Sequence, residues 1–148
     1  MLMLRKVRKD DSELLYYWAN DRDVRDMSVN QKPIFWQDHV SWLKKKLADN
    51  NLKMFILLDG VQEVGQIRLE YKEGQWIIGY SISAEFRGKG YGKRIVELGL
   101  QEIDKGVIIA FVKPSNKASL KIFSDLGFDN LGLTENQGVR LVKFTLGK

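Results

Sequence analysis

Cysteine is absent from this chain of 148 residues, and histidine occurs only once, at position 39. Without cysteine the chain forms no disulfide, builds no thiolate zinc site and offers no thiol nucleophile for catalysis. A single histidine also excludes a metal centre built from several imidazole ligands. We therefore expect the protein to work without a metal ion.

Long apolar runs are missing as well. A membrane-spanning helix needs about 20 consecutive apolar residues, and no segment of this sequence approaches that length. The first residues, Met1–Asp11, are rich in charged side chains, which excludes the apolar centre of a secretory signal peptide there. We therefore expect a cytoplasmic protein that has no membrane partner.

The composition is that of an ordinary globular protein, with 44% hydrophobic and 29% charged residues. The length suits one domain with a single sizeable core, so we expect residues 1–148 to fold together. The net charge of +5 is compatible with nucleic acid or with a phosphorylated small molecule. Basic residues gather in Lys44–Lys46, where a solvated helix face explains them, and among the glycines of residues 87–94. The second group favours a small phosphorylated ligand over nucleic acid.

Hydrophobic periodicity and turn residues predict the order of the elements. Strands are expected at Leu2–Val7, Lys53–Leu58, Glu63–Tyr71, Trp76–Ser83, Val107–Val112, Phe128–Leu133 and Val139–Leu146. Helices are expected at Ser12–Ala19, Trp36–Leu47, Tyr91–Asp104 and from Pro114–Asn116 to Gly127, with Asn20–Pro33 as a loop or a broken helix. Hairpin turns at Asp59-Gly60 and Glu73-Gly74 join three strands into an antiparallel meander. The pattern predicts one α+β domain around a mostly antiparallel sheet.

The sharpest motif is Arg87-Gly88-Lys89-Gly90-Tyr91-Gly92, which lies between a predicted strand and a predicted helix. Alternate glycines let successive backbone N–H groups turn toward one concavity, and the helix adds the positive end of its dipole. Such a loop suits a diphosphate, although a turn without a ligand also explains the glycines. The spacing matches neither the Rossmann fingerprint, whose third glycine comes one residue later, nor a Walker A loop.

The motif Arg87-x-x-Gly90-x-Gly92 resembles the R/Q-x-x-G-x-G/A signature of the GNAT superfamily of N-acetyltransferases. The segment Ile77–Ile82 is similar to the fourth strand of that family, and Asn116–Ser119 with Leu126–Phe128 is similar to its later N-x-x-S and L-G-F pair. The resemblance implies a single-domain GNAT fold. Its central seven-stranded mixed sheet splays between the fourth and fifth strands and is flanked by about four helices. It also implies acetyl-CoA as the cosubstrate.

The resemblance further implies how coenzyme A is held. Backbone groups of the glycine motif bind its diphosphate, with Arg87, Lys89 and Lys93 supplying charge. The pantetheine arm pairs like a strand with Ser81 and Ile82, and Asn116 approaches from the other side while it also caps a helix. The expected cofactor-binding residues are Ser81, Ile82, Arg87, Gly88, Lys89, Gly90, Tyr91, Gly92, Lys93, Asn116, Ser119 and Phe123.

In this family the amine attacks the thioester directly, which is consistent with the absence of cysteine. The implied oxyanion donor is the backbone N–H of Ile82. Many members carry a tyrosine seven residues after the asparagine, as acid for the departing thiolate, but this chain has Phe123 there. Tyr80 is a candidate acid and Glu70 a candidate base acting through water. Packing for Tyr80 and an ion pair for Glu70 are the alternatives.

The first third of the chain should hold the acceptor. Its segments Trp18–Asp21, Val24-Arg25 and Trp36–Trp42 resemble nucleotide-sugar N-acetyltransferases of pseudaminic acid-type pathways, which acylate a 4-amino group on a UDP-linked deoxysugar. The resemblance implies that His39 contacts the nucleotide-sugar and that Arg25 lines the same site, although a packed role suits His39 equally. Ribosomal-protein N-terminal acetyltransferases share parts of these segments, and a non-catalytic acetyl-CoA-binding module is a further alternative. The sequence leaves the acceptor and the oligomeric state open.

Overall fold

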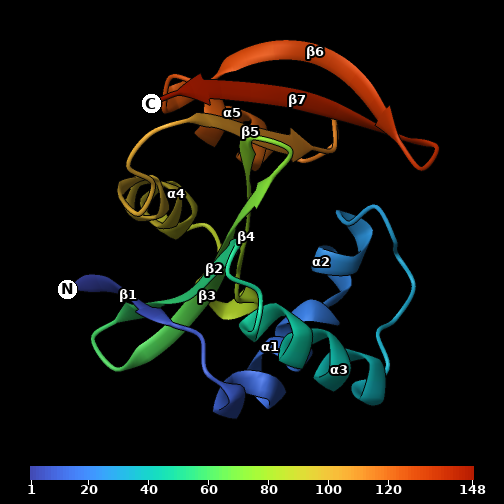
Figure 1. The fold of residues 1–148 in the computed structure, drawn as a ribbon, viewed down its shortest axis with the longest axis vertical. Coiled ribbons are helices and arrows are strands. Elements are labelled where there is room, and N and C mark those ends of the chain that lie inside the picture. The colour runs from blue at the N-terminus through green and yellow to red at the C-terminus, as the bar shows by residue number, and fades with distance from the viewer.

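The computed structural model describes residues 1–148 and contains one seven-stranded sheet with the order β1-β2-β3-β4-β5-β7-β6 (Figure 1). The strands are β1 Leu2–Lys6, β2 Leu52–Asp59, β3 Gln62–Lys72, β4 Gln75–Ile82, β5 Val107–Val112, β6 Asp129–Asn136 and β7 Val139–Gly147. The helices are α1 Ser12–Ala19, α2 Arg22–Asp26, α3 Trp36–Leu47, α4 Tyr91–Gln101 and α5 Lys117–Asp125, with 3-10 turns η1 Lys9–Asp11 and η2 Ala84–Phe86.

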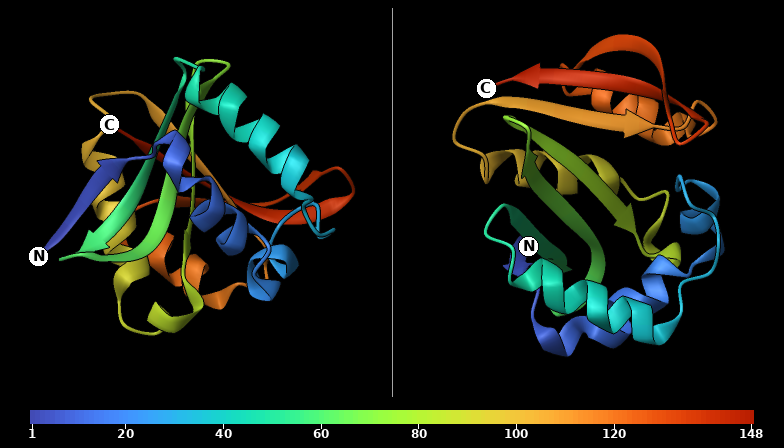
Figure 2. Two further views of the ribbon diagram at one scale, coloured as in Figure 1. Left: turned by 90° about the horizontal axis from the view of Figure 1, so that it is seen from below. Right: turned by 45° about the vertical axis from the view of Figure 1, so that its right-hand side comes forward.

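The sheet is mixed because β4 and β5 run parallel while every other neighbouring pair is antiparallel. The parallel pair holds only at Trp76↔Ile108 and Ile77↔Ile109. Beyond these positions β4 and β5 diverge, which Figure 2 shows as a wedge between the two parts of the sheet. The predicted α+β fold, with a splay between the fourth and fifth strands, is confirmed.

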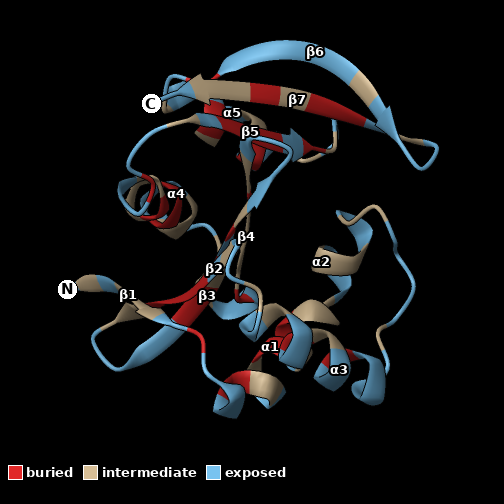
Figure 3. Ribbon diagram, viewed as in Figure 1, coloured by how far each residue is buried: buried red, intermediate tan, exposed pale blue.

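Helices cover both faces of the sheet. Helix α4 packs on β3 and β4 and contributes Ile95 and Val96 to the larger of two hydrophobic clusters. Helices α1 and α3 pack together over the opposite face, where Leu15 and Leu43 join Ile56 of β2 in the smaller cluster. Figure 3 shows these buried residues along the centre of the sheet and on the inner sides of the helices. The chain is therefore a three-layer α/β/α arrangement over β1–β4.

The structure differs from the predicted elements most clearly at two places. The expected loop or broken helix at residues 20–33 contains the short helix α2, because the Asp21 side chain caps it by accepting from the N–H groups of Asp23 and Val24. There are thus five α-helices where about four were expected. Strand β6 extends to Asn136, since it pairs along β7 up to a tight turn. None of the helices is long and apolar enough to cross a bilayer.

Candidate active site

An open cleft of about 970 Å³ lies where β4 and β5 separate. One side is formed by α1, α2 and α3, and the other by the end of β5 and the start of α5. Strands β3 and β4 form its floor, and the glycine motif before α4 closes one end. The cleft therefore joins segments from the first third, the middle and the last third of the chain.

The register of β3 and β4 determines which backbone groups face the cleft. Ser83 N–H donates to the Val64 carbonyl at 2.8 Å, and hydrogen-bonded pairs alternate along an antiparallel ladder. The next hydrogen-bonded pair is therefore Gln66 with Ser81, whereas Ile82, opposite Gly65, directs its N–H and carbonyl away from β3. The backbone of Ile82 thus points toward the gap left by β5, as the predicted role of its N–H as an oxyanion donor requires. The backbone of Ser81 is used by β3, so only its side chain is available to the cleft.

The glycine motif adopts the conformation that only glycine adopts readily. Gly88 and Gly90 have φ of 76° and 86°, and Gly90 is the N-cap residue that directly precedes α4. A Cβ on either residue would meet no protein atom within 4 Å, so backbone conformation and not packing requires glycine there. Gly92 differs, because its Cβ would lie 2.9 Å from Ile122 Cδ1, so the end of that side chain would have to shift. The helix N-terminus and its N–H groups thus open toward the cleft and suit a diphosphate.

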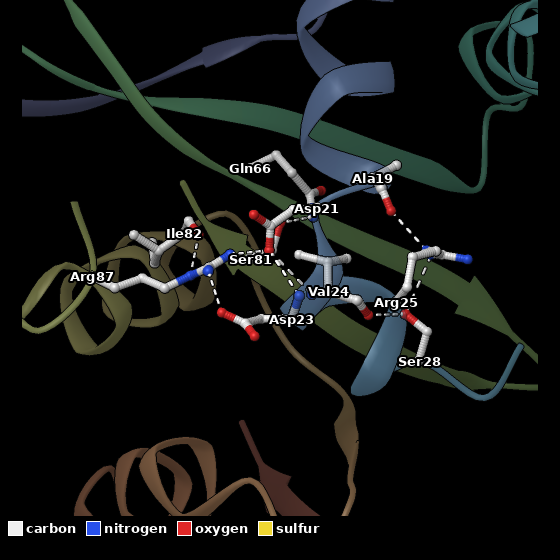
Figure 4. A network of polar contacts seen from close by, with 10 residues as sticks. All are labelled: Ala19, Asp21, Asp23, Val24, Arg25, Ser28, Gln66, Ser81, Ile82 and Arg87. Carbon is white, nitrogen blue, oxygen red and sulfur yellow. Dashed lines mark hydrogen bonds and ion pairs between the residues drawn. The ribbon is translucent and has the colours of Figure 1, made fainter. Parts of the chain in front are cut away.

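Arg87 pairs with two carboxylates at the start of α2 (Figure 4). Its Nε donates to the Ile82 carbonyl at 3.0 Å, and its two terminal nitrogens donate to Asp21 and Asp23 at 2.9 Å each. Partial burial raises the pKa of Asp21, but hydrogen bonds from Arg87 and from the Val24 N–H outweigh it, so the pKa of Asp21 is lowered. The positive charge of Arg87 is therefore balanced within the chain, and the side chain ties α2 to the cofactor loop.

The other basic residues of the motif lie in different surroundings. Lys93 borders the cleft, whereas Lys89 has its ammonium 5.7 Å from the ring centroid of Phe86. Tyr91 donates its hydroxyl to Asp59, and this hydrogen bond raises the pKa of Tyr91. Lys93 is therefore the predicted basic residue with the clearest access to a bound phosphate.

Asn116, Ser119 and Tyr80 form a connected group on the opposite side. The Asn116 Oδ1 caps α5 by accepting from the Ser119 N–H at 3.2 Å. The Ser119 hydroxyl lies 2.6 Å from the Tyr80 hydroxyl, and burial raises the pKa of Tyr80. The phenol consequently stays protonated at neutral pH and can donate a proton at the cleft.

Phe123 is mainly a core residue. Its side chain is 2% exposed, and its ring centroid lies 5.0 Å from that of Phe128 and 5.7 Å from that of Phe144. The Tyr80 ring contacts the same side chain at 6.1 Å between centroids. The Tyr80 ring thus packs against the residue at position 123, where many family members carry a tyrosine.

His39 lies in an aromatic stack along α3. Its ring is 5.9 Å from that of Trp36 and 5.8 Å from that of Trp42, and it is 2% exposed. The His39 Nε2 lies 2.9 Å from the Ser12 carbonyl, which can only accept, so Nε2 carries the proton. Burial lowers the pKa of His39 despite this hydrogen bond. The ring is therefore neutral, joins α3 to the start of α1, and borders the cleft.

Glu70 does not border the cleft. Its carboxylate accepts from the Lys46 ammonium at 3.0 Å, in a partly exposed ion pair. The structure therefore does not bring this candidate base together with Ile82 and Tyr80.

Arg25 does border the cleft, and it holds the segment between α2 and α3. Its guanidinium donates to the carbonyls of Ala19 at 2.7 Å and Asn30 at 2.9 Å, and to the Ser28 hydroxyl at 3.3 Å. Figure 4 shows the contacts with Ala19 and Ser28. All its hydrogen-bond partners are uncharged, so Arg25 keeps its full positive charge beside the cleft.

Sequence reasoning missed two residues on the floor of the cleft, Gln66 and Arg68 of β3. Gln66 donates to the Ser81 hydroxyl at 3.0 Å, and its Oε1 is the one buried side-chain oxygen or nitrogen without a partner. Both residues alternate with the buried Ile67 and Leu69. A row of polar residues within a central strand was the signal that could have identified them.

The model of the protein family described as "Acetyltransferase (GNAT) domain" matches residues 1–129, which are most of the chain. This protein belongs to the GNAT acetyltransferase family. GNAT enzymes use acetyl-CoA, and the glycine motif with the divergence of β4 and β5 fits that cosubstrate in this chain.

Several proteins with related sequences are themselves named acetyltransferases. The "Uncharacterized N-acetyltransferase p20" of Bacillus licheniformis is 24% identical over 144 residues, which cover 89% of this chain and 81% of that protein. "Acetyltransferase PseH" of Campylobacter jejuni is 22% identical over 130 residues, covering 83% and 80% of the two chains.

Solved structures share the fold. The aminoglycoside acetyltransferase AAC(6')-Ib in complex with coenzyme A has a TM-score of 0.83 at 18% identity, covering 100% of this chain and 95% of that one. Spermidine N-acetyltransferase from Vibrio cholerae, in complex with CoA and spermine, has a TM-score of 0.85 at 16% identity, covering 99% and 95%. The GNAT protein described here is thus an acetyl-CoA-dependent N-acetyltransferase, and the comparisons leave its acceptor open.

Proposed function

We propose that this GNAT enzyme acetylates an amino group on an anionic acceptor, namely a nucleotide-linked amino sugar. The observation that carries the proposal is the charge of the side chains that line the cleft. Arg25, Arg68 and Lys113 border it, and the hydrogen-bond partners of Arg25 and Lys113 there are uncharged groups. Of the carboxylates that border the cleft, Asp23 is paired with Arg87, which leaves Asp38. This excess of positive charge attracts an anion.

The same charge argues against a polycationic acceptor. Structural neighbours hold the aminoglycosides ribostamycin and kanamycin, or spermine. A polyamine or an aminoglycoside carries several ammonium groups, which need carboxylates nearby to replace lost water. Asp38 alone offers little of that compensation against Arg25 and Arg68. The fold is shared with those enzymes, and the charge of this cleft supports a different acceptor.

Aromatic side chains on the acceptor side add to the argument. Trp18 and Trp42 border the cleft and provide flat faces against which a sugar or a nucleobase can pack. The resemblance of the first third of the chain to nucleotide-sugar N-acetyltransferases points the same way, and so does the similarity to PseH.

In the proposed reaction acetyl-CoA supplies an activated thioester. The residues of the chain orient the reacting groups and protonate the departing thiolate. The Ile82 N–H, directed to the gap between β4 and β5, provides a fixed donor where negative charge develops. The Tyr80 hydroxyl is the acid for the departing thiolate, and Ser119, at 2.6 Å, orients it. A sugar amine is surrounded by electron-withdrawing oxygens and loses its proton more readily than a lysine amine, so the site needs no strong base.

The test is a comparison of acceptors with labelled acetyl-CoA. The enzyme should acetylate a UDP-linked 4-amino sugar with a kcat/KM at least tenfold above that for kanamycin, spermidine or a peptide with a free N-terminus. A higher value for the peptide would replace the proposal with an N-terminal acetyltransferase, and a higher value for kanamycin or spermidine would refute an anionic acceptor. Binding of acetyl-CoA without transfer to any amine would indicate a non-catalytic module.

A further inference from the structure

Arg68 is an arginine without a partner in the middle of the sheet. It lies on β3, opposite Gly79 of β4, and its side chain borders the acceptor cleft. No hydrogen bond or ion pair joins its guanidinium to another residue of the chain. Arg68 is an exposed residue, and the space that it faces is the cleft. An unpaired guanidinium in that position is free to bind an anionic ligand.

The Arg68 side chain packs against the ring of Trp42. The central carbon of the guanidinium lies 5.6 Å from the centroid of the indole ring, within the range of a cation–π contact. Trp42 is itself stacked on His39 at 5.8 Å, and His39 is bound to the Ser12 carbonyl. The aromatic stack therefore keeps the Arg68 guanidinium against a fixed surface, so little side-chain entropy remains to be lost on binding.

The charges around Arg68 leave it undercompensated. Removal from water lowers the pKa of Arg68, the negative charge of Glu70 opposes this, and the positive charge of Arg25 adds to it. Glu70 is paired with Lys46, while Arg25 binds only uncharged groups. Arg25 and Arg68 thus both border the cleft, and neither guanidinium is paired with a carboxylate. An anion bound there would offset the repulsion of both.

We propose that Arg68, seated on the Trp42 ring, is the anion subsite of the acceptor cleft and binds a phosphate group of the acceptor. The planar guanidinium presents two parallel N–H donors, which match two phosphate oxygens, and Arg25 adds a second positive charge in the same cleft. This subsite is distinct from the glycine motif at residues 87–93, because Arg68 lies on β3 opposite Gly79, whereas the motif follows the end of β4 at Ile82. The inference rests on the proposed function, since it identifies what the anionic part of that acceptor contacts.

The test measures binding of UDP to protein saturated with CoA, so that the cofactor loop is already filled. Arg68→Gln should raise the Kd for UDP roughly ten- to hundredfold, the range expected for charge-assisted hydrogen bonds. Arg68→Lys, which keeps the charge and loses the paired donors, should have an intermediate effect. The matched control is Arg140→Gln on β7, which removes the same charge from an exposed site outside the cleft and should leave the Kd unchanged. All three variants should keep the CoA affinity of the parent, which shows that they fold.

The outcomes separate this inference from the proposed function. UDP binding that is equal in Arg68→Gln and Arg140→Gln overturns the subsite, as does a parent enzyme that binds no UDP beside CoA. Arg68-dependent UDP binding by an enzyme that acetylates no UDP-amino sugar would support the subsite and refute the proposed acceptor. Conversely, acetylation of such a sugar with the same KM in parent and Arg68→Gln would support the acceptor and refute the subsite.

Discussion

Single residues of the cleft have structural duties that can be separated from binding. His39 is the only histidine, so few other side chains titrate between pH 5 and 7. Its Nε2 is held by the Ser12 carbonyl, and its ring lies between two tryptophans. The protein should therefore stabilise the neutral ring.

Stability should fall as the pH drops below about 6.5, the value for histidine in an unfolded chain. Burial lowers the pKa of His39, so in this range the unfolded chain takes up a proton that the native state resists. The stabilisation is present above that pH and is lost as the pH falls through the lower native pKa. Urea unfolding at pH 7.5 and 5.5 measures the difference, and His39→Gln should reduce it. An equal difference in the variant would assign the pH dependence to other groups.

Asn116 combines a cap with an expected contact to the pantetheine arm. Asn116→Ala should lower the free energy of unfolding by about 1 kcal/mol, because α5 loses its cap. Asn116→Asp keeps the capping oxygen and loses the amide donor, so its stability should equal that of the parent. Both variants should bind acetyl-CoA more weakly, as calorimetry would show. Unchanged affinity in Asn116→Asp would leave only the cap.

Tyr80 is the residue whose hydroxyl can replace the missing tyrosine at position 123. Tyr80→Phe should lower kcat by roughly 10²-fold, at the lower end of the range for a removed acid, and should change the Kd for acetyl-CoA little. Ser119→Ala should lower kcat less, because it removes only the group that orients the phenol. A kcat equal to that of the parent in Tyr80→Phe would mean that the thiolate leaves without an acid.

At the scale of elements, the contact between β3 and β4 positions the edge of β4 that faces the gap to β5. A Cβ on Gly65 would lie 2.5 Å from the Ser81 carbonyl oxygen and 3.2 Å from the Ile82 Cα, so the two strands would have to move apart. Gly65→Ala should therefore lower the free energy of unfolding by about 2 kcal/mol, as overpacking does, and should weaken CoA binding. Gly79→Ala on β4 is the control, since its Cβ meets no atom within 4 Å. Equal stability of the two variants in urea would show that the strands yield easily.

At the scale of the molecule, Arg87 connects helix α2 with the glycine motif that precedes α4. Arg87→Gln should lower stability by no more than about 1 kcal/mol, because its ion pairs with Asp21 and Asp23 are partly exposed. Hydrogen exchange in residues 22–26 should nevertheless become faster, and the acceptor KM should rise more than the Kd for CoA. A tenfold rise in the Kd for CoA with unchanged exchange would instead show that Arg87 serves the phosphates directly, as the sequence alone suggested.

The sequence by itself determined the features that depend on neighbouring residues. The glycines at positions 88 and 90 and the helix that follows them form a local unit, since positive φ and a helix N-terminus need no distant partner. The cap at Asn116 is local for the same reason. The order of strands and helices also followed from periodicity and turns, apart from α2, whose five residues are too few to show a period.

Only the tertiary structure decided the features that depend on residues far apart in the chain. The hydrogen bond from Arg87 to Asp21 spans 66 positions, and no local pattern distinguishes an arginine that binds carboxylates from one that binds phosphate. Strand β4 pairs with β5 at two positions only, and the cleft opens where they separate. Arg68 of β3 forms part of the floor of that cleft. The sequence shows which side chains are charged. Whether a charged side chain has a partner of opposite charge depends on which segments the sheet brings together.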